Sequence, residues 1–402
     1  MRGSWKLLGT LILAPLLAAW GTSSGGAPNF TSSHNPTSPS VPQAGSGTTQ
    51  LTLTPQQGFT GTVNLSLVGA PSGVGLPPSS VSVSGPNPVN QTLTVNVTSS
   101  VPSGTHNLQV QATSGSIAKA ASLSLTVFAP GVNWTLRASG TSNTLLSVTY
   151  GNHTFVAVGE DGTILTSANG GGWTARASGT PNHLRDVTYG NHTFVAVGDL
   201  GTILTSTDGV NWVAWSSGTT HHLHGVTYGN RTFVAVGDWG TILTSTDGVS
   251  WTRQYSGTSH WLRGVTYGSN TFVAVGTEGT ILTSPDGVDW MERASGTSHW
   301  LRGVTYGSNT FVAVGDWGTI RTSPDGVDWT ARTSGTRRWL GSVTYANNTF
   351  VAVGDWGTIL TSSNGVNWTA RTWGTGAWLY GITYGNATFV AVGFDGTILT
   401  SP

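Results

Sequence analysis

The sequence contains no cysteine, so neither disulfide bonds nor cysteine-ligated metal sites can form in this chain. Charged side chains are scarce too: they make up 8% of the 402 residues, and 16 basic residues balance 16 acidic ones. A neutral, sparsely charged surface disfavours binding to nucleic acids or to anionic membranes, since both depend on clustered positive charge. There is also no phosphate-binding glycine loop, because the 57 glycines recur as turn residues.

Long apolar runs are absent except near the N-terminus. There, Arg2 and Lys6 precede an apolar stretch at residues 7–19 that ends in small residues. This pattern is typical of a secretory signal peptide, and the stretch is too short to span a bilayer. The segment around Trp20 has the form of a lipoprotein signal with tryptophan in place of the lipidated cysteine, which favours an ordinary signal peptide. We therefore predict a signal peptide at residues 1–21, a secreted or extracytoplasmic protein, cell-surface association included, and no transmembrane segment in the mature chain.

Two regions of different composition follow. Residues 22–47 are rich in serine, threonine, proline, glycine and asparagine, which predicts a flexible linker. Residues 48–128 alternate polar and apolar side chains, as in QLTLT and QTLTVNV, which indicates half-buried strands. Roughly seven such runs separated by turn residues predict an immunoglobulin-like β-sandwich. The stretch GFTGTVNLSLVGAPSGV resembles the immunoglobulin-like spacer domains of bacterial secreted and surface proteins.

From residue 131 onward the sequence repeats every 39 residues. The repeat is marked by a phenylalanine at Phe155, Phe194, Phe233, Phe272, Phe311, Phe350 and Phe389. Each unit holds runs such as LRGVTY, TFVAVG and TILTS, which are rich in β-branched and aromatic residues and are bounded by turn residues. A period near 40 of this kind predicts the four-stranded blades of a propeller. The expected fold is therefore all-β, with a seven-bladed β-propeller over residues 131–402 preceded by the sandwich.

The strands at the two ends of the repeat region are offset. The first outer strand, at Trp134, precedes the first complete unit, whereas the last apolar run, Thr397 to Ser401, has no outer strand after it. We predict that the strand at Trp134 closes the ring by completing the last blade, because closure removes two open sheet edges.

The turn before each outer strand carries a recognisable motif. Segments such as STDGVNW, Ser206 to Trp212, resemble the Asp-box or BNR repeat, Ser-x-Asp-x-Gly-x-x-Trp, with one residue fewer and with asparagine at Asn169 and Asn364. The resemblance covers residues 131–402. It implies a folded turn on the outer rim that has no chemical role. The same class of domains includes sialidases, xyloglucan-cleaving enzymes and photosystem II assembly factors.

The copies differ from one another mainly in two loops that the blade topology places on one face of the ring. Tryptophan is concentrated there, at Trp239, Trp261, Trp300, Trp317, Trp339, Trp356 and Trp378. Beside them stand His260, His299, Asp238, Asp316 and Asp355. Other copies carry His183, His222 or Leu200 at these points, which disfavours a purely structural role for the tryptophans. The alternative, aromatic side chains that only fill gaps between loops, stays open.

The sequence gives less support to the hypotheses of catalysis and of metal binding. The arginines and tyrosines of the repeat, such as Arg137 and Tyr150, lie on the outermost strand and at the far end of the innermost one, so they cannot converge as in a sialidase. The aspartates in the G-D-W-G turns are expected to bond their own turn backbone. The histidines His221, His222 and His224 could ligate a metal together with His183 or His260, but their spacing in a loop favours ordinary surface histidines. We predict no catalytic residue, no metal and no cofactor.

These observations predict a non-catalytic binding protein. The preferred partner is a glycan or another cell-surface polymer, bound at several sites at once, with Trp300 and Trp317, and Trp339 and Trp356, as the best sites. One alternative is a protein-assembly scaffold with a protein partner, which the resemblance to photosystem II assembly factors implies. Another is a glycoside hydrolase of the sialidase or xyloglucan-cleaving type.

Overall fold

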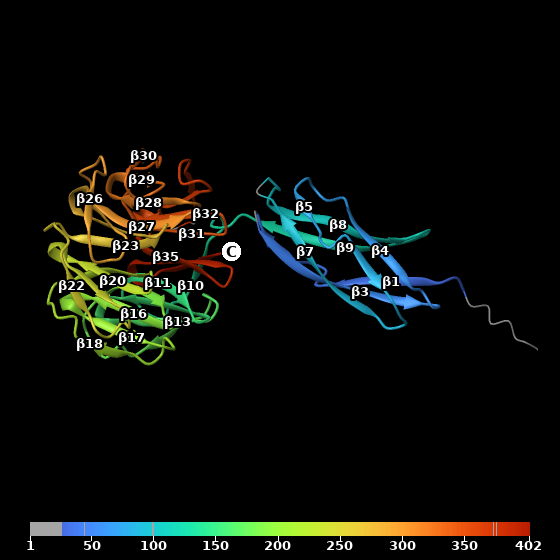
Figure 1. The fold of residues 1–402 in the computed structure, drawn as a ribbon, viewed down its shortest axis with the longest axis horizontal. Helices are drawn as coiled ribbons and strands as arrows, with labels where there is room; N and C mark the ends of the chain where they lie inside the picture. The colour runs from blue at the N-terminus through green and yellow to red at the C-terminus, as the bar shows by residue number, and fades with distance from the viewer. Residues whose placement is uncertain (1–25, 44, 99, 373, 375) are drawn as a thin grey trace, which may run out of the picture.

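The structure is a computed structural model that describes residues 26–402 apart from residues 44, 99, 373 and 375. The predicted signal peptide at residues 1–21, including Trp20, lies outside the described residues. Figure 1 shows two all-β bodies, an N-terminal sandwich and a C-terminal propeller. In the part of the chain that the structure describes, no helix has the length and apolar character needed to cross a membrane.

Two sheets form the sandwich. One has the order β1-β3-β7-β5 and consists of β1 (Asn29–Asn35), β3 (Ser46–Gln56), β7 (Val89–Val97) and β5 (Val74–Gly75). The other has the order β2-β9-β8-β4-β6 and consists of β2 (Ser40–Pro42), β9 (Ile117–Phe128), β8 (Gly104–Ser114), β4 (Gly61–Val68) and β6 (Ser80–Val83). Alternate side chains, such as Leu51, Leu53 and Leu93, are fully buried, as the period-two pattern predicts.

The structure differs from the expectation of a flexible linker over residues 22–47. Strand β1 pairs with β3 from Asn29 to Asn35, and β2 runs parallel to β9. Phe30 and Val41 are fully buried in the sandwich core. The composition predicted a linker because polar side chains dominate this segment. Two buried apolar residues and backbone pairing are nevertheless sufficient to hold it on the sheets.

Within its described residues, the repeat region forms seven four-stranded antiparallel sheets, here called blades. The innermost strands are β11 (Leu145–Gly151), β15 (Leu184–Gly190), β19 (Leu223–Gly229), β23 (Leu262–Gly268), β27 (Leu301–Gly307), β31 (Leu340–Ala346) and β35 (Leu379–Gly385). The second strands, with the TFVAVG run, are β12 (Thr154–Gly159), β16 (Thr193–Gly198), β20 (Thr232–Gly237), β24 (Thr271–Gly276), β28 (Thr310–Gly315), β32 (Thr349–Gly354) and β36 (Thr388–Gly393).

The third strands are β13 (Ile164–Ser167), β17 (Ile203–Ser206), β21 (Ile242–Ser245), β25 (Ile281–Ser284), β29 (Ile320–Ser323), β33 (Ile359–Ser362) and β37 (Ile398–Ser401). The outermost strands are β14 (Thr174–Arg176), β18 (Val213–Trp215), β22 (Thr252–Gln254), β26 (Met291–Arg293), β30 (Thr330–Arg332), β34 (Thr369–Arg371) and β10 (Thr135–Arg137). Blades are named below by their strands.

Each second strand is buried on both faces because it packs against two blades. In β24, Phe272 and Ala274 pack with the preceding blade, whereas Val273 and Val275 pack against Phe311 of the next. All of these side chains are fully buried. One such cluster occupies each interface between neighbouring blades of the described chain. The apolar core of the propeller is therefore a ring of interfaces between blades.

The predicted closure is present. Strand β10 pairs with β37, with Thr135 opposite Thr400, so the last blade combines strands from both ends of the repeat region. Phe155 and Val390 meet in one core cluster, which joins the first blade to the last. Gly131, at a φ of 70°, donates its N–H to the Pro402 carbonyl at 3.3 Å.

The turns between the third and outermost strands, whose sequence resembles the Asp-box, are held by their own hydrogen bonds. We call them the outer turns. In one copy Asp247 Oδ1 accepts the N–H groups of Val249 and Ser250 at 2.8 and 2.9 Å, and the Ser245 hydroxyl accepts the Gly248 N–H at 2.8 Å. These backbone donors lower the pKa of Asp247. Asn364 Oδ1 accepts the same two bonds in its copy, since the turn needs only an acceptor. The motif is therefore complete without a ligand.

Candidate ligand-binding face

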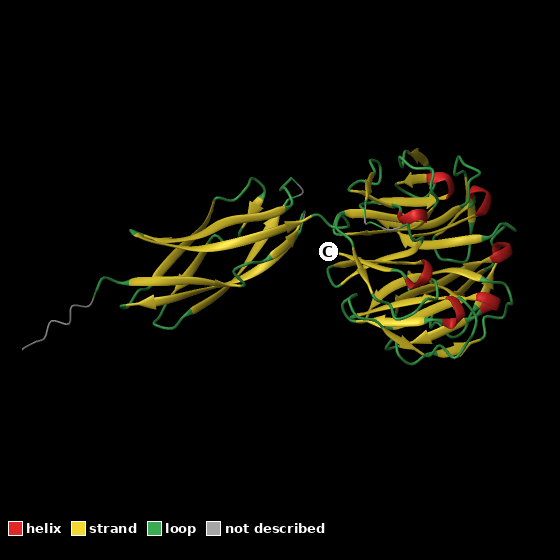
Figure 2. Cartoon of the chain, turned by 180° about the vertical axis from the view of Figure 1, so that it is seen from behind, coloured by secondary structure: helices red, strands yellow, loops and turns green. Residues whose placement is uncertain are grey.

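Short 3-10 turns connect the second and third strands of every blade. They are η1 (Glu160–Gly162), η2 (Asp199–Gly201), η3 (Asp238–Gly240), η4 (Thr277–Gly279), η5 (Asp316–Gly318), η6 (Asp355–Gly357) and η7 (Phe394–Gly396). Figure 2 shows them gathered on the side of the propeller away from the sandwich. Each turn is bonded to the loop that enters the same blade; Thr277, for example, donates its N–H to the Trp261 carbonyl at 2.9 Å. We call these turns and entering loops the loop face.

Three of the predicted tryptophans occupy the middle of a turn and are largely exposed. Trp239, Trp317 and Trp356 retain 59, 66 and 61% of their accessible surface. Their φ angles lie between 49° and 57°, in the left-handed region that bulky side chains avoid. The same backbone holds Leu200 and Asp395 in other blades, so the turn itself does not require an indole.

The entering loops hold the other tryptophans. Trp261, Trp300 and Trp339 are half-buried, whereas Trp378 is exposed. Arginines of the innermost strands lie between the half-buried indoles: the Arg263 guanidinium is 5.1 Å from the Trp261 ring centre and 5.5 Å from that of Trp300. Arg302 lies 5.8 Å from Trp300 and 5.2 Å from Trp339 in the same way. Cations and indoles thus alternate along three neighbouring blades.

Two carboxylates of the turns contact a basic side chain on the innermost strand of their own blade. Asp238 is buried and its Oδ1 lies 2.6 Å from His224 Nε2, and Asp316 accepts a bond of 2.5 Å from Arg302 Nε. The expectation that the turn aspartates bond their own backbone is therefore wrong for these two side chains. Burial lowers the pKa of His224 to about 4, with the nearby Arg263 adding to the effect, so this imidazole is neutral at pH 7.

Three blades carry only one member of such a pair. The β11–β14 blade has Glu160 but Leu146 in place of the basic residue, and Glu160 accepts the Thr144 N–H at 3.3 Å. The β23–β26 blade has Arg263 but Thr277 in place of the turn carboxylate, and within the described residues the buried Arg263 Nε has no hydrogen-bond partner. The β31–β34 blade has Asp355 but Gly341 in place of the basic residue, and the buried Asp355 Oδ1 is likewise unbonded. Burial lowers the pKa of Arg263 and raises that of Asp355.

The predicted histidines take part in the turns. His260 and His299 bond the hydroxyls of Thr280 and Thr319 through Nδ1 at 2.7 and 2.9 Å. Asn143 makes the equivalent bond in the first blade, so the contact belongs to the fold and leaves Nε2 of each histidine for other partners. Among the described residues, no group of three or more histidine, aspartate or glutamate side chains is arranged to hold a metal ion.

Asp186, which sequence reasoning missed, joins three innermost strands. Its carboxylate accepts the Ser147 hydroxyl at 2.6 Å and the N–H groups of Val187 and Val226 at 2.9 and 2.8 Å. Burial outweighs these bonds and raises the pKa of Asp186 to about 6. Other blades carry glycine or serine at this position, such as Gly225 and Ser342.

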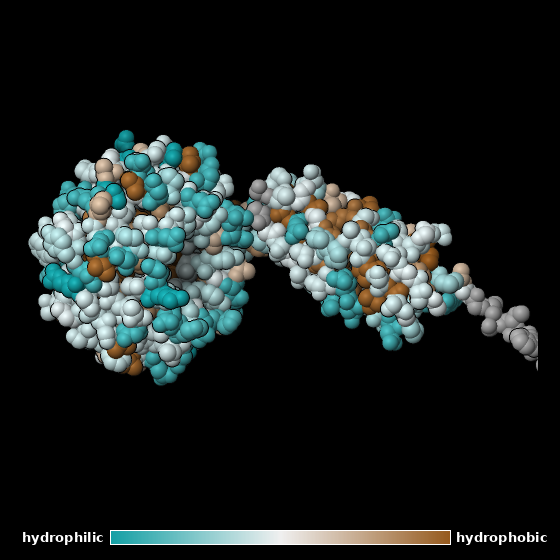
Figure 3. Space-filling view, in the orientation of Figure 1, coloured by the Kyte–Doolittle hydropathy of each residue, from teal (hydrophilic) through white to brown (hydrophobic). Residues whose placement is uncertain are grey.

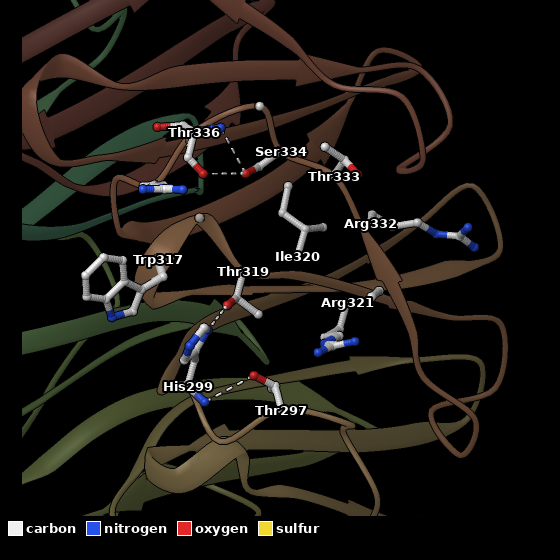
Figure 4. Close-up of a pocket in the computed structure, with 14 residues that line it drawn as sticks. Thr297, His299, Trp317, Thr319, Ile320, Arg321, Arg332, Thr333, Ser334 and Thr336 are labelled. Atoms are coloured by element: carbon white, nitrogen blue, oxygen red, sulfur yellow. Dashed lines mark hydrogen bonds between the residues drawn. The ribbon is translucent and has the colours of Figure 1, made fainter.

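A pocket of about 520 Å³ opens beside Trp317 on the β27–β30 blade (Figure 4). Its walls come from the η5 turn, from β29 and β30, and from the loops on either side of the blade. They carry Trp317, His299, Arg321, Arg332 and Arg337 together with several threonine and serine hydroxyls. Arg321 stands at a position where the other copies carry leucine, such as Leu282 and Leu360.

Contacts between aromatic rings on the loop face do not test the predicted ligand sites, which remain predictions. Trp300 and Trp317 lie in one blade, as do Trp339 and Trp356, yet the ring contacts among the described residues join other side chains. Trp239 meets Trp261 of the next blade at 6.5 Å between ring centres, and Trp339 meets Trp378 at 6.4 Å. On the side of the propeller that Figure 3 shows, hydrophobic side chains (brown) are isolated among mostly neutral and hydrophilic ones (white and teal).

No protein-family model matches the sequence, and no curated protein matches it. Solved structures similar in fold include a quinonprotein alcohol dehydrogenase-like protein from Bacteroides thetaiotaomicron, with 10% identity over 83% of this chain and 93% of that one, at a TM-score of 0.41. Sqt1 from Saccharomyces cerevisiae shares 9% identity over 74% of this chain and 92% of its own, at a TM-score of 0.46. At such identities, neither structure informs about a ligand or an activity of this chain.

Proposed function

We propose that this chain is a secreted or extracytoplasmic, non-catalytic protein that binds carbohydrate through the loop face. In this proposal the propeller is seven-bladed and belongs to the Asp-box class, and the N-terminal sandwich is an immunoglobulin-like spacer. The partner is a glycan or another cell-surface polymer.

The observation that carries the proposal is the placement of Trp239, Trp317 and Trp356. A left-handed backbone costs a residue with a side chain about 1–2 kcal/mol, and glycine, asparagine or aspartate would cost less there. The exposed indoles bury little surface in return. Folding alone therefore does not account for tryptophan at these turns, whereas a ligand that covers the indoles would.

Carbohydrate suits the chemistry of this face. A sugar ring presents apolar C–H groups that stack on an indole, while its hydroxyls bond to nearby polar side chains. Threonine and serine hydroxyls and the Nε2 atom of His299 supply such groups around Trp317. Several similar sites on one ring suit a polymer, because simultaneous contacts multiply weak affinities.

A non-catalytic role is supported by the ion pairs of two turn carboxylates, Asp238 and Asp316. A glycoside hydrolase needs two carboxyl groups at a defined separation, one of them free to transfer a proton. Asp238 and Asp316 are each bonded to a basic side chain of their own blade. This pairing favours a role in shaping the loop face.

A glycan array with the full mature chain tests the proposal. The matched control replaces Trp239, Trp317 and Trp356 by leucine, the residue that Leu200 already places in this turn. We expect the parent to bind a subset of glycans and the triple variant to lose that binding, since truncating one anchoring indole costs about 2 kcal/mol, roughly thirtyfold in affinity. A parent that binds no glycan, or a triple variant that binds as the parent does, would contradict the proposal.

A further inference from the structure

The pocket beside Trp317 is lined by cationic side chains with no acidic one among them. Its walls carry the guanidinium groups of Arg321, Arg332 and Arg337, and none of the residues that line it is aspartate or glutamate. In a chain whose acidic and basic residues are equal in number, this concentration of one sign is local. The pocket therefore attracts negative charge.

Arg321 is the residue that sets this pocket apart. The other blades carry leucine at its position, and those leucines, such as Leu282 and Leu360, are buried. Arg321 donates from Nη2 to the Gly296 carbonyl at 2.7 Å, whereas its buried Nε has no hydrogen-bond partner among the described residues. Burial also lowers its pKa. A partly desolvated guanidinium without an anion lacks the partner that would best stabilise it.

The closing blade offers an internal comparison. A pocket at the equivalent place there is lined by Asp395, Ser142 and Arg137. Asp395 stands where Trp317 is, Ser142 where Arg337 is, and Leu399 occupies the position of Arg321. The equivalent pocket thus has neither the indole nor two of the three arginines, and it has a carboxylate of its own. The cationic character belongs to the β27–β30 blade and is not imposed by the fold.

Figure 4 shows how the pocket is arranged. The Trp317 indole and the Arg321 guanidinium lie on opposite sides of His299 and Thr319 in this view, and Arg332 extends away from Trp317. His299 is tied to Thr319 through Nδ1. A ligand that touches both Trp317 and Arg321 must therefore offer a stacking surface at one place and an anionic group at another.

We propose that this pocket selects an acidic saccharide, with a sugar ring stacked on Trp317 and a carboxylate or sulfate group bonded by Arg321, supported by Arg337. The inference rests on the proposed carbohydrate binding and names the class of ligand for one site. Arginine is suited to this task because its planar fork of N–H donors matches the oxygens of a carboxylate or sulfate. The threonine and serine hydroxyls of the walls bond the neutral hydroxyls of the sugar.

Isothermal titration calorimetry of the full chain at one fixed ionic strength tests the inference. The probes are a uronic-acid tetrasaccharide, a sulfated tetrasaccharide and a neutral glucose tetrasaccharide. We expect at least one acidic probe to bind roughly tenfold or more tightly than the neutral one, and the stronger of the two identifies the anionic group. Arg321→Leu and Arg337→Ser, which copy residues of other blades, should each remove most of this preference. Trp317→Leu should weaken all three probes.

Arg176→Leu is the matched control, because it removes one positive charge from an outer strand of another blade. It should leave the affinities unchanged. Equal binding of acidic and neutral probes, or acidic binding that survives Arg321→Leu in the folded variant, overturns the acidic preference while carbohydrate binding stands. If none of the probes binds and the array is also blank, the proposed function fails as well. Arg337 is exposed, so Arg337→Ser decides the matter even if Arg321→Leu does not fold.

Discussion

The two faces of the propeller use the same repeat in different ways. The outer turns of one face repeat both backbone and side chains, and each turn satisfies its own polar groups, as Asp247 and Ser245 do. On the loop face the backbone repeats equally well, down to the left-handed residue in every turn, but the side chain at that residue is tryptophan, leucine, aspartate or glutamate. A backbone that accepts so many side chains does not dictate any of them, so the variation carries information beyond folding.

The largest expected effect comes from breaking the ring itself. Deleting residues 131–138 removes β10, leaves the last blade with three strands and exposes the edge of β37. The unpaired backbone groups of this strand edge can pair with another copy of the chain. We therefore expect aggregation or a loss of several kcal/mol of stability. Size-exclusion chromatography and thermal unfolding measure both. A deletion variant that remains monomeric and melts with the parent would show that closure by β10 does not stabilise the ring.

The outer turns and Asp186 of the innermost strand β15 should respond oppositely to acid. The carboxylates of the outer turns have lowered pKa values, so the stability they provide is lost as the pH falls below about 4. Asp186 has a raised pKa of about 6, so its contribution is complete below pH 4 and is lost as the pH rises toward 6. The expected loss is on the order of 3 kcal/mol.

The variant Asp186→Asn isolates this effect. It cannot ionise, so its stability relative to the parent should rise between pH 4 and pH 6 and stay level above that. Urea unfolding at several pH values gives the difference in the free energy of unfolding between variant and parent. The lowered pKa of His224 has the opposite effect on stability over the same pH range, but it acts on both proteins and cancels in this difference. A difference that does not change with pH would mean that Asp186 titrates normally.

A smaller effect is expected from giving Arg263 the acidic partner that its blade lacks. Thr277→Asp gives the β23–β26 blade the carboxylate that Asp199 and Asp316 provide to Arg185 and Arg302. The unbonded Arg263 Nε then gains a charged acceptor, and we expect about 1 kcal/mol of added stability after the cost of burying the new carboxylate. Chemical unfolding of parent and variant measures it. Destabilisation instead would indicate that Arg263 has no room for a partner in its own blade.

Much of the fold could be predicted because the same pattern of strand and turn residues recurs in every copy of the repeat. The fixed spacing of Phe155 and its equivalents, the TFVAVG run buried on both faces and the offset strand at Trp134 all led to arrangements that the structure contains. The linker expectation failed where a segment appears only once. There, Phe30 and Val41 were too few to form a pattern, although both are fully buried.

The loop face could be predicted only as a set of positions. Comparing the copies placed the tryptophans, His260, His299 and the turn aspartates on one face, which is where the structure has them. It could not show that Asp316 bonds Arg302, because that contact depends on how two strands meet, nor that Arg321 lines a pocket with Arg337. The repeat gives the positions of these residues within a blade, but it does not give the directions of their side chains.

The central claim is that the exposed tryptophans of the loop face serve a ligand and not the fold. Thermal unfolding of Trp317→Ala and Trp356→Ala beside Trp290→Ala tests it most directly. Trp290 is half-buried, donates its indole N–H to the Gly287 carbonyl at 2.8 Å and packs near Phe272, so its loss should cost roughly 2–4 kcal/mol. The two loop variants should melt within about 1 °C of the parent, as expected for surface changes. Loop variants that unfold as early as Trp290→Ala would contradict the account.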